Sequence, residues 1–263
     1  MLSSAEPSRL FGKFAEGDTI FVGELRGQKV METGASCLRD LMEAGTRSGG
    51  KEHDLSSLRT LAPVDRPCKI ICVGLNYRSH IAEMDQPEPK EPVIFTKPSS
   101  AVIGPDEEIA LPGISARVDF EGESAIVIGR RAKDVTDGLD HVFGYTCLND
   151  VTARDLQKKD MDWTRAKGFD TFAPIGPYIS TRVPTSVTTR LNGKVVQRAP
   201  MSDRVFGDSA LVAYISSIMT LETGDVIATG TPAGIAPMKP GDIVEVEVDS
   251  VGCLRNSVAG RQG

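Results

Sequence analysis

Three carboxylates carry the clearest chemistry in this 263-residue chain: Glu121, Glu123 and Asp150. Residues 118–129 end in an apolar, β-branched run that a glycine stops, which predicts a β-strand. Side chains alternate faces along a strand, so Glu121 and Glu123 should point to the same side and Asp119 to the other. Two neighbouring carboxylates repel each other unless a cation neutralises them. Hard dications prefer carboxylate oxygens, so the pair suggests a metal site.

The third carboxylate, Asp150, closes a second strand-like run at 142–149, just before a predicted helix. Three anionic ligands around one dication leave coordination positions open for water or for the two oxygens of a 2-oxo acid. This oxygen set suits Mg²⁺ and Mn²⁺ equally well. Taken alone, two glutamates at i and i+2 are more often a solvated strand face. The metal interpretation therefore depends on the other motifs of the chain.

A second pattern with chemical potential is His80-x-x-Glu83. Residues three apart on a helix share a face, so Glu83 can accept an N–H of the imidazole and orient the ring. Such a dyad predicts a general base that can take a proton from water. The alternative is a solvent-exposed helix pair, which is the commoner meaning of an isolated His-x-x-Glu. The other histidines, His53 and His141, offer no zinc-binding spacing.

Candidate substrate contacts follow two of the predicted strands. The Gly-Thr-Pro-Ala-Gly turn at 230–234 can present the Gly230 N–H and the Thr231 hydroxyl to a carboxylate. A simple turn between strands is the alternative, and the Gly-Lys-Ser/Thr ending of a Walker A loop is absent. Arg154 and Gln157 follow Asp150 on a predicted helix, and we expect both to contact substrate.

The elements that must position these residues are mostly short β runs broken by proline and glycine. Helices are predicted at 77–84, 152–159 and 209–219. Asn76 or Ser79 is the expected cap of the first helix, and Thr152 with Asp155 fits a capping box for the second. Many strands with few helices predict a mostly β, α+β domain.

The N-terminal region, 1–62, is predicted to be a small accessory region that precedes a catalytic domain at 69–263. Alternating and apolar segments predict a strand pair at 19–25 and 27–31. A short helix is expected at 36–42 with Ser36 as its cap. The polar stretch 46–51 has the composition of a linker.

Bulk composition excludes several classes of partner. The formal net charge of −6 and pI of about 5.2 argue against nucleic acid or an anionic membrane. Neither a membrane-length apolar run nor a signal peptide is recognisable. Five cysteines, an odd number without a Cys-x-x-Cys pair, predict reduced thiols and a cytoplasmic location.

In order and spacing, these segments resemble the fumarylacetoacetate hydrolase superfamily from about residue 69 to the C-terminus. The motifs lie at 73–83, 91–98, 118–129, 149–157, 165–171, 174–177 and 224–234. The resemblance implies a mixed β-sandwich roll and a homodimer. It also implies that the three carboxylates hold Mg²⁺, Mn²⁺ or sometimes Ca²⁺, and that the helix with His80 is a mobile lid.

The same resemblance implies the activity. It implies that the Lys167 ammonium lies near the reacting carbonyl of a small anionic keto acid, where it would stabilise developing negative charge. The expected reaction is metal-dependent hydrolysis of a carbon–carbon bond in an acylpyruvate-type or fumarylpyruvate-type β-diketo acid. Oxaloacetate decarboxylation and keto–enol tautomerisation pass through the same enolate and stay as alternatives. A non-catalytic keto-acid or metal-binding protein is a further alternative, against which the intact His80–Glu83 pair argues.

Overall fold

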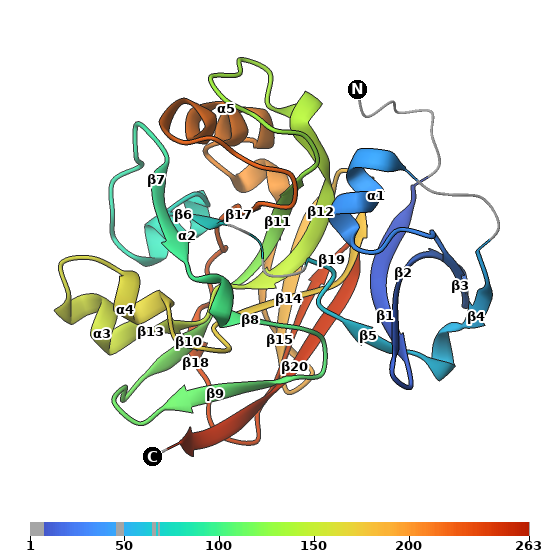
Figure 1. Ribbon diagram of the computed structural model, residues 1–263. Coiled ribbons are helices and arrows are strands. Elements are labelled where there is room, and N and C mark those ends of the chain that lie inside the picture. The colour runs from blue at the N-terminus through green and yellow to red at the C-terminus, as the bar shows by residue number, and fades with distance from the viewer. Residues whose placement is uncertain (1–7, 46–49, 65–66, 68, 263) are drawn as a thin grey trace.

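The computed structural model describes residues 8–45, 50–64, 67 and 69–262, and strands dominate it (Figure 1). Within these residues the strands form a 12-stranded, a five-stranded and a three-stranded sheet. The helices are few and short, and the longest, Asp208–Ile218, shares a hydrophobic cluster with strands of the large sheet. The predicted mostly β, α+β class is confirmed.

The large sheet runs in the order β4-β3-β2-β1-β14-β12-β11-β17-β6-β7, with β5 on β1 and β8 on β14. Its strands are β1 (Leu10–Glu16), β2 (Thr19–Arg26), β3 (Lys29–Glu32), β4 (Glu52–Asp54), β5 (Arg59–Leu61), β6 (Ile70–Gly74), β7 (Val93–Lys97), β8 (Val102–Ile103), β11 (Gly122–Ile128), β12 (Val142–Asn149), β14 (Ala173–Ser180) and β17 (Val226–Ala228).

The five-stranded sheet has the order β16-β15-β19-β20-β9, and the three-stranded sheet the order β13-β10-β18. Their strands are β9 (Glu108–Pro112), β15 (Ser186–Leu191), β16 (Lys194–Pro200), β19 (Ile243–Val248), β20 (Gly252–Gln262), β10 (Val118–Phe120), β13 (Thr152–Ala153) and β18 (Ala236–Pro237). The helices are α1 (Leu38–Ala44), α2 (Arg78–Glu83), α3 (Arg154–Lys159), α4 (Thr164–Lys167) and α5 (Asp208–Ile218). Single 3₁₀ turns occupy Leu55–Ser57, Ser99–Ala101, Leu139–His141 and Met201–Asp203.

Strand β11 lies between two hydrophobic clusters, and all seven of its residues are buried. Ala125 and Val127 belong to one cluster, whereas Ile126 and Ile128 belong to the other, because successive side chains leave opposite faces of a strand. The second cluster includes residues of α5 and of the five-stranded sheet. A strand buried on both faces is a rigid base for the carboxylates at its start.

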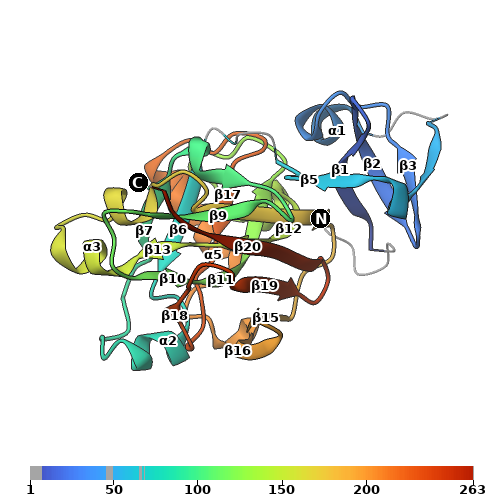
Figure 2. The same cartoon turned by 90° about the horizontal axis from the view of Figure 1, so that it is seen from below.

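The N-terminal elements β1–β5 and α1 form a lobe beside the rest of the molecule (Figure 2). Strand β1 continues the large sheet by pairing with β14, in the register Leu10↔Ser180. The predicted strand pair is present as β2 and β3. The predicted cap of α1 is wrong: Cys37 Sγ accepts the Asp40 N–H, while the Ser36 hydroxyl binds the Asp40 carboxylate.

Most of the predicted linker, residues 46–49, lies outside the described residues. The division of the chain at 62 and 69 stays a prediction. The cysteines that the structure describes, Cys37, Cys72, Cys147 and Cys253, are free thiols. Within the described part of the chain, no helix has both the length and the apolar character needed to span a membrane.

The predicted helices are present, but the predicted caps of α2 and α3 are wrong. Neither N-cap residue, Tyr77 or Ala153, caps its helix with its side chain. The Asn76 side chain instead forms hydrogen bonds with backbone groups of Phe206 and Thr229. It thereby links the chain before α2 to two segments that are distant in sequence. The Thr152 hydroxyl donates to the Asp150 carbonyl, and Asp155 accepts from Ser115 and Ala116.

Candidate active site

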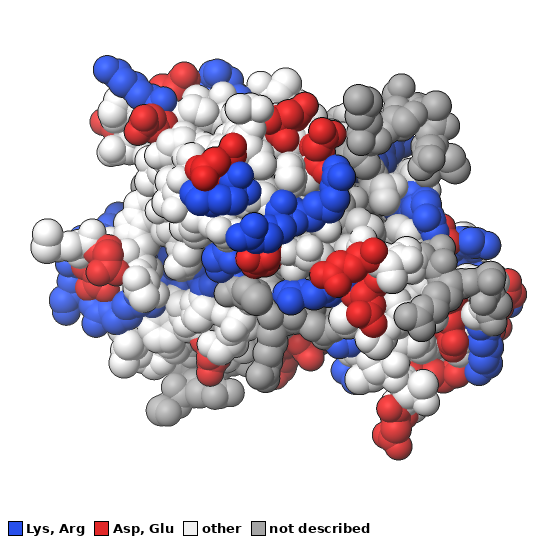
Figure 3. Space-filling view, turned by 45° about the horizontal axis from the view of Figure 1, so that its top comes forward, with Lys and Arg blue, Asp and Glu red and all other residues white. Residues whose placement is uncertain are grey.

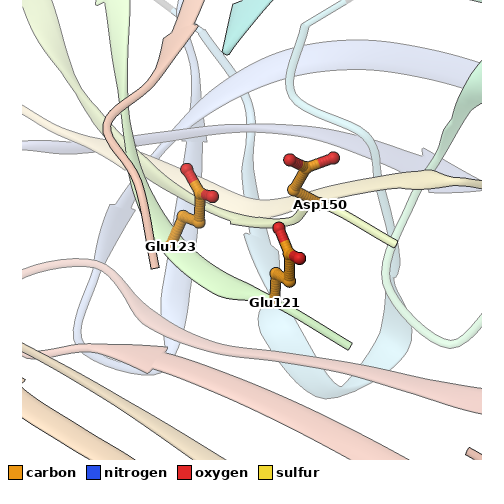
Figure 4. Close-up of side chains that lie close together, drawn as sticks. All are labelled: Glu121, Glu123 and Asp150. Atoms are coloured by element: carbon orange, nitrogen blue, oxygen red, sulfur yellow. The ribbon is translucent and has the colours of Figure 1, made fainter. Parts of the chain in front are cut away.

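The chain at Glu121 changes partners between two sheets. The single strand predicted for 118–129 is wrong: β10 ends at Phe120 and β11 begins at Gly122. Gly122 lies so close to β15 that an added Cβ would meet Thr189 Oγ1 at 2.0 Å. Despite the break, the Glu121 and Glu123 side chains still reach the same space (Figure 4).

Strand register brings Asp150 to these glutamates. Gly122 pairs with Asn149 across β11 and β12, and the next residue, Asp150, donates its N–H to the Glu121 carbonyl at 2.8 Å. One carboxylate oxygen from each of Glu121, Glu123 and Asp150 lies within 4.8 Å of the others, and all three residues are buried. The convergence that the sequence predicted is present (Figure 4).

Cationic side chains surround two of the three carboxylates. Lys167 Nζ lies 2.8 Å from Glu121 Oε2 and 2.6 Å from Asp150 Oδ2. Lys97 Nζ lies 2.6 Å from Asp150 Oδ1 and also donates to the Val151 carbonyl at 3.0 Å. The Arg154 guanidinium contacts the remaining oxygen of Glu121. Burial alone would raise the pKa of Glu121, but Lys167 and Arg154 outweigh it and lower that pKa.

Sequence reasoning missed Lys97. Lysines are exposed by default, and nothing in the run 93–97 marks this one as buried. Its side chain is fully buried because β7 pairs with β6 at the edge of the large sheet and ends against Asp150. The only available signal was its place inside a segment that resembled the family.

Glu123 shows whether the carboxylate set fits a metal ion. It is 2% exposed and accepts one hydrogen bond, from the Gly230 N–H at 2.7 Å. No cationic side chain in the described residues forms an ion pair with it. Burial, followed by the nearby Asp150 and Glu121 charges, raises the pKa of Glu123 well above its usual value. The ionised form of a carboxylate in this position requires a cation, and a hard dication with oxygen ligands fits the three-carboxylate set.

The dyad lies on α2, across the same cavity. His80 Nδ1 is 2.9 Å from Glu83 Oε2, and the other Glu83 oxygen accepts the Gly234 N–H at 2.9 Å. Because an ionised carboxylate can only accept, Nδ1 carries a proton, and in the neutral imidazole Nε2 is then the acceptor. This is the orientation that a general base needs. The pairing predicted from the i, i+3 spacing is present, and its catalytic role stays a prediction.

Most of the predicted site residues line one cavity of about 230 Å³. The three carboxylates, His80, Lys167, Arg154, Gln157 and Thr231 line it, together with apolar and aromatic residues such as Leu75, Met84, Phe95 and Trp163. Glu83 and Gly230 are not among its lining residues; they bind His80 and Glu123 from behind. The predicted residues therefore fall into those that face the cavity and those that support them.

The predicted substrate contacts are already engaged with protein groups. Arg154 Nε lies 2.9 Å from Asp119 Oδ2, and another of its nitrogens donates to Gln157. The Thr231 hydroxyl donates to the Gly122 carbonyl at 3.0 Å. Asp119 is thus a buried partner of Arg154, away from the metal set, as its strand face predicted. Contacts of Arg154, Gln157, Thr231 and Gly230 with substrate stay predictions.

An aromatic wall positions the helix that carries Lys167. Trp163 precedes α4 and meets Phe95 edge-on, with ring centroids 5.0 Å apart. It also covers Gly74, where an added Cβ would lie 2.9 Å from the indole. Lys167 Nζ lies 4.9 Å from the centroid of the Phe95 ring. Trp163 therefore serves both as a packing residue and as a wall of the cavity.

Basic and acidic side chains are intermingled on the face of the molecule in Figure 3. Inside the cavity, Lys167 and Arg154 are buried cations that lie beside the three carboxylates.

Comparison with known proteins supports one family. The model for the fumarylacetoacetate hydrolase C-terminal domain matches residues 69–259. A protein of Archaeoglobus fulgidus is 55% identical over 213 residues, which cover 79% of this chain and 85% of that protein. The mitochondrial oxaloacetate tautomerase of Xenopus laevis is 40% identical, over 89% of this chain and 78% of the relative.

A solved structure gives the same result for the fold. The 2-hydroxyhepta-2,4-diene-1,7-dioate isomerase from Mycobacterium marinum matches with a TM-score of 0.87 and 39% identity, over 97% of this chain and 100% of that one. The match therefore includes the N-terminal lobe as well as the region of the family model. The chain belongs to the fumarylacetoacetate hydrolase family.

Proposed function

We propose that this protein is a divalent-metal-dependent enzyme that interconverts the keto and enol forms of a small 2-oxo dicarboxylic acid such as oxaloacetate. The observation that carries the proposal is a single cavity that holds three carboxylates, a buried lysine and an oriented histidine. The name of the Xenopus relative supports this choice of reaction.

Glu121, Glu123 and Asp150 would hold Mg²⁺ or Mn²⁺, which supplies the positive charge that makes a C3 proton of a 2-oxo acid more acidic. His80 Nε2 removes this proton, and the electrons of the C3–H bond form the C2–C3 double bond. Glu83 binds the Nδ1–H and stabilises the imidazolium that results. Returning the proton to the 2-oxo oxygen gives the enol and restores His80.

Other residues of the cavity hold the substrate. Lys167 adds positive charge beside the carboxylates, where negative charge develops on the 2-oxo oxygen. Arg154 and Gln157 line the same cavity and would bind the second carboxylate of a dicarboxylic acid. Phe95 and Trp163 exclude water from this side, which favours proton transfer over side reactions.

The second candidate is hydrolysis of a carbon–carbon bond in an acylpyruvate. The family description and the His80–Glu83 dyad favour it, because the same base can activate water. Water would lose a proton to His80 and add to the distal carbonyl. The bond between that carbon and C3 would then break, and the pyruvate enolate would leave. Oxaloacetate decarboxylation forms the same enolate without an attacking water.

A substrate panel distinguishes these reactions. Oxaloacetate, acetylpyruvate and fumarylpyruvate would be incubated with protein and Mg²⁺ or Mn²⁺, while enol absorbance and products are followed. Tautomerisation accelerates the absorbance change of oxaloacetate without consuming it, decarboxylation yields pyruvate, and hydrolysis yields two acids. Uncatalysed rates with every substrate and both metals would contradict the proposed function.

A further inference from the structure

The turn at 230–234 binds two functional carboxylates at its two ends. The Gly230 N–H donates to Glu123 Oε2 at 2.7 Å, and the Gly234 N–H donates to Glu83 Oε1 at 2.9 Å. Glu123 belongs to the carboxylate triad, and Glu83 orients the histidine. We propose that this turn is a positioning element that fixes the base relative to the metal ligands, an inference that rests on the proposed function of both groups.

The two donors require glycine for reasons unrelated to substrate. Gly230 has φ +95, and an added Cβ would lie 2.9 Å from Asn76 Cβ. Gly234 has φ +109, and an added Cβ would lie 2.0 Å from the Val196 carbonyl oxygen. Only glycine adopts this backbone conformation without strain and leaves room for the neighbouring groups. The turn is therefore held in the conformation that aims both N–H groups at carboxylates.

Gln197 on β16 fastens the middle of the turn to the strand that carries the glutamates. Its Nε2 donates to Thr231 Oγ1 at 2.8 Å and to the Pro232 carbonyl at 2.7 Å. Its Oε1 accepts the Gly122 N–H at 3.0 Å, and Thr231 donates to the Gly122 carbonyl. Gln197 is 1% exposed. The start of β11, the turn and the five-stranded sheet thus form one hydrogen-bonded frame.

Helix α2 depends on this frame for the alignment of its dyad. It has six residues, and the Glu83 side chain is 30% exposed. Its first turn has contacts of its own: the Ser79 hydroxyl donates to Asp203 at 2.6 Å, and the same oxygen accepts the Ala233 N–H at 3.5 Å. The Gly234 N–H is the contact that ties the carboxylate of the dyad to the frame. Loss of that contact would free Glu83 to rotate and would leave His80 without a fixed partner.

The arrangement separates two effects that a general weakening of the fold would not separate. Loosening the Gly234 end should impair the base while metal affinity is unchanged. Loosening the Gly230 end should impair metal affinity, because Glu123 loses its only hydrogen-bond donor among the described residues. A turn with a merely structural role would change both together or neither.

Gly234→Ala tests the first effect. We expect kcat for oxaloacetate tautomerisation to fall by about 10- to 100-fold, toward the loss for a misaligned base, and Mn²⁺ affinity by calorimetry to stay within about twofold. In a Glu83→Ala background the same substitution should cause no further fall, because residues that act through one contact are not additive. Gly193→Ala is the matched control, with φ +78 and nothing within 4 Å of the added Cβ.

Amide exchange tests the contacts directly and does not require a glycine variant to fold or any reaction to be known. In Glu83→Ala, exchange at Gly234 should accelerate by about tenfold or more, while exchange at Gly230 is unchanged. In Glu123→Ala the pattern should reverse. Unchanged exchange at Gly234 in Glu83→Ala, or equal losses of kcat from Gly234→Ala in both backgrounds, would overturn the inference. Because amide exchange is measured without substrate, failure of the proposed reaction would leave this result standing.

Discussion

The two sides of the cavity are held in different ways. On the sheet side, Glu121, Glu123, Asp150, Lys97 and Lys167 are all buried, and Glu121 and Asp150 form ion pairs with the lysines. All of them except Lys167, which ends α4, come from strands or strand ends. On the helix side, the dyad lies on a helix of six residues whose N-cap residue, Tyr77, provides no side-chain cap. The carboxylates and lysines are therefore preorganised by the core, whereas the His80–Glu83 base is aligned by only a few contacts.

The largest expected effect comes from breaking the sheet side. Glu121→Ala, Glu123→Ala and Asp150→Ala should each reduce activity to the uncatalysed rate, because two carboxylates no longer complete the metal site. A chelator should do the same to the wild-type protein, and added Mg²⁺ or Mn²⁺ should restore the rate. Steady-state kinetics checks both, with circular dichroism to confirm folding. Full activity after exhaustive chelation would contradict the metal requirement.

Lys167→Met should have the next largest effect. Burial opposes the charged form of this lysine, but Asp150 and Glu121 raise its pKa, so it is a cation in the folded protein. Without it, two buried carboxylates lose an ion pair, and the free energy of unfolding should fall by about 3–5 kcal/mol.

The rate should fall as well, by about 10²- to 10³-fold, the scale for a lost group that stabilises transition-state charge. Denaturant unfolding and kinetics measure the two effects. Lys159→Met, on an exposed position of α3, is the control and should change neither. A stable, fully active Lys167→Met protein would show that the lysine is only one of several interchangeable cations.

Breaking the helix side should impair chemistry but not metal binding. His80→Asn and Glu83→Ala should each lower kcat by about 10²-fold, the usual minimum for a general base. Mn²⁺ affinity should be unchanged, because neither residue belongs to the carboxylate triad. If metal affinity falls in parallel with kcat, the two sides of the cavity are not independent.

The same variants sharpen the choice of reaction. If hydrolysis is the activity, the dyad activates water, and any residual decarboxylation of oxaloacetate should fall much less than hydrolysis does. If tautomerisation is the activity, the dyad moves the substrate's own proton, so both variants should slow the keto–enol interconversion of oxaloacetate itself. Wild-type rates with every keto acid would mean that His80 and Glu83 are a structural pair.

The smallest expected effect is on the aromatic wall. Trp163→Phe leaves a smaller ring beside Gly74 and Phe95 and should enlarge the cavity. We expect a loss of about 1–2 kcal/mol in the free energy of unfolding, within the common range for single substitutions. The ratio of kcat/KM for a longer 2-oxo acid to that for oxaloacetate should rise severalfold. An unchanged ratio would mean that the wall only supports Lys167.

Local spacing predicted the parts of the site that depend on one element. The shared side of Glu121 and Glu123 follows from strand alternation, and the His80–Glu83 contact follows from helix geometry. The same reasoning predicted both ends of α5 to within one residue. In each case the interaction is set within a few residues of chain.

Contacts between distant elements could not be predicted in this way. Lys97 is a site residue only because β7 ends against Asp150, and Gln197 reaches the turn from another sheet. The expected capping box failed because Thr152 and Asp155 found partners outside their own helix. Nothing in the sequence indicated that the Gly230 N–H binds Glu123, a contact that depends on the fold. Where a polar group has several possible partners, the tertiary structure determines which of them it binds.

The central claim is that Glu121, Glu123 and Asp150 form a divalent-metal site, and Mn²⁺ binding to the isolated protein tests it most directly. Electron paramagnetic resonance would follow loss of the free Mn²⁺ signal during titration of wild-type protein and of Glu123→Gln. Glutamine keeps the size of the side chain and an acceptor for the Gly230 N–H but removes the charge. We expect the wild-type protein to bind one Mn²⁺ ion tightly per chain and Glu123→Gln to bind it at least about 10-fold more weakly. Equal binding by both proteins, or none by either, would contradict it.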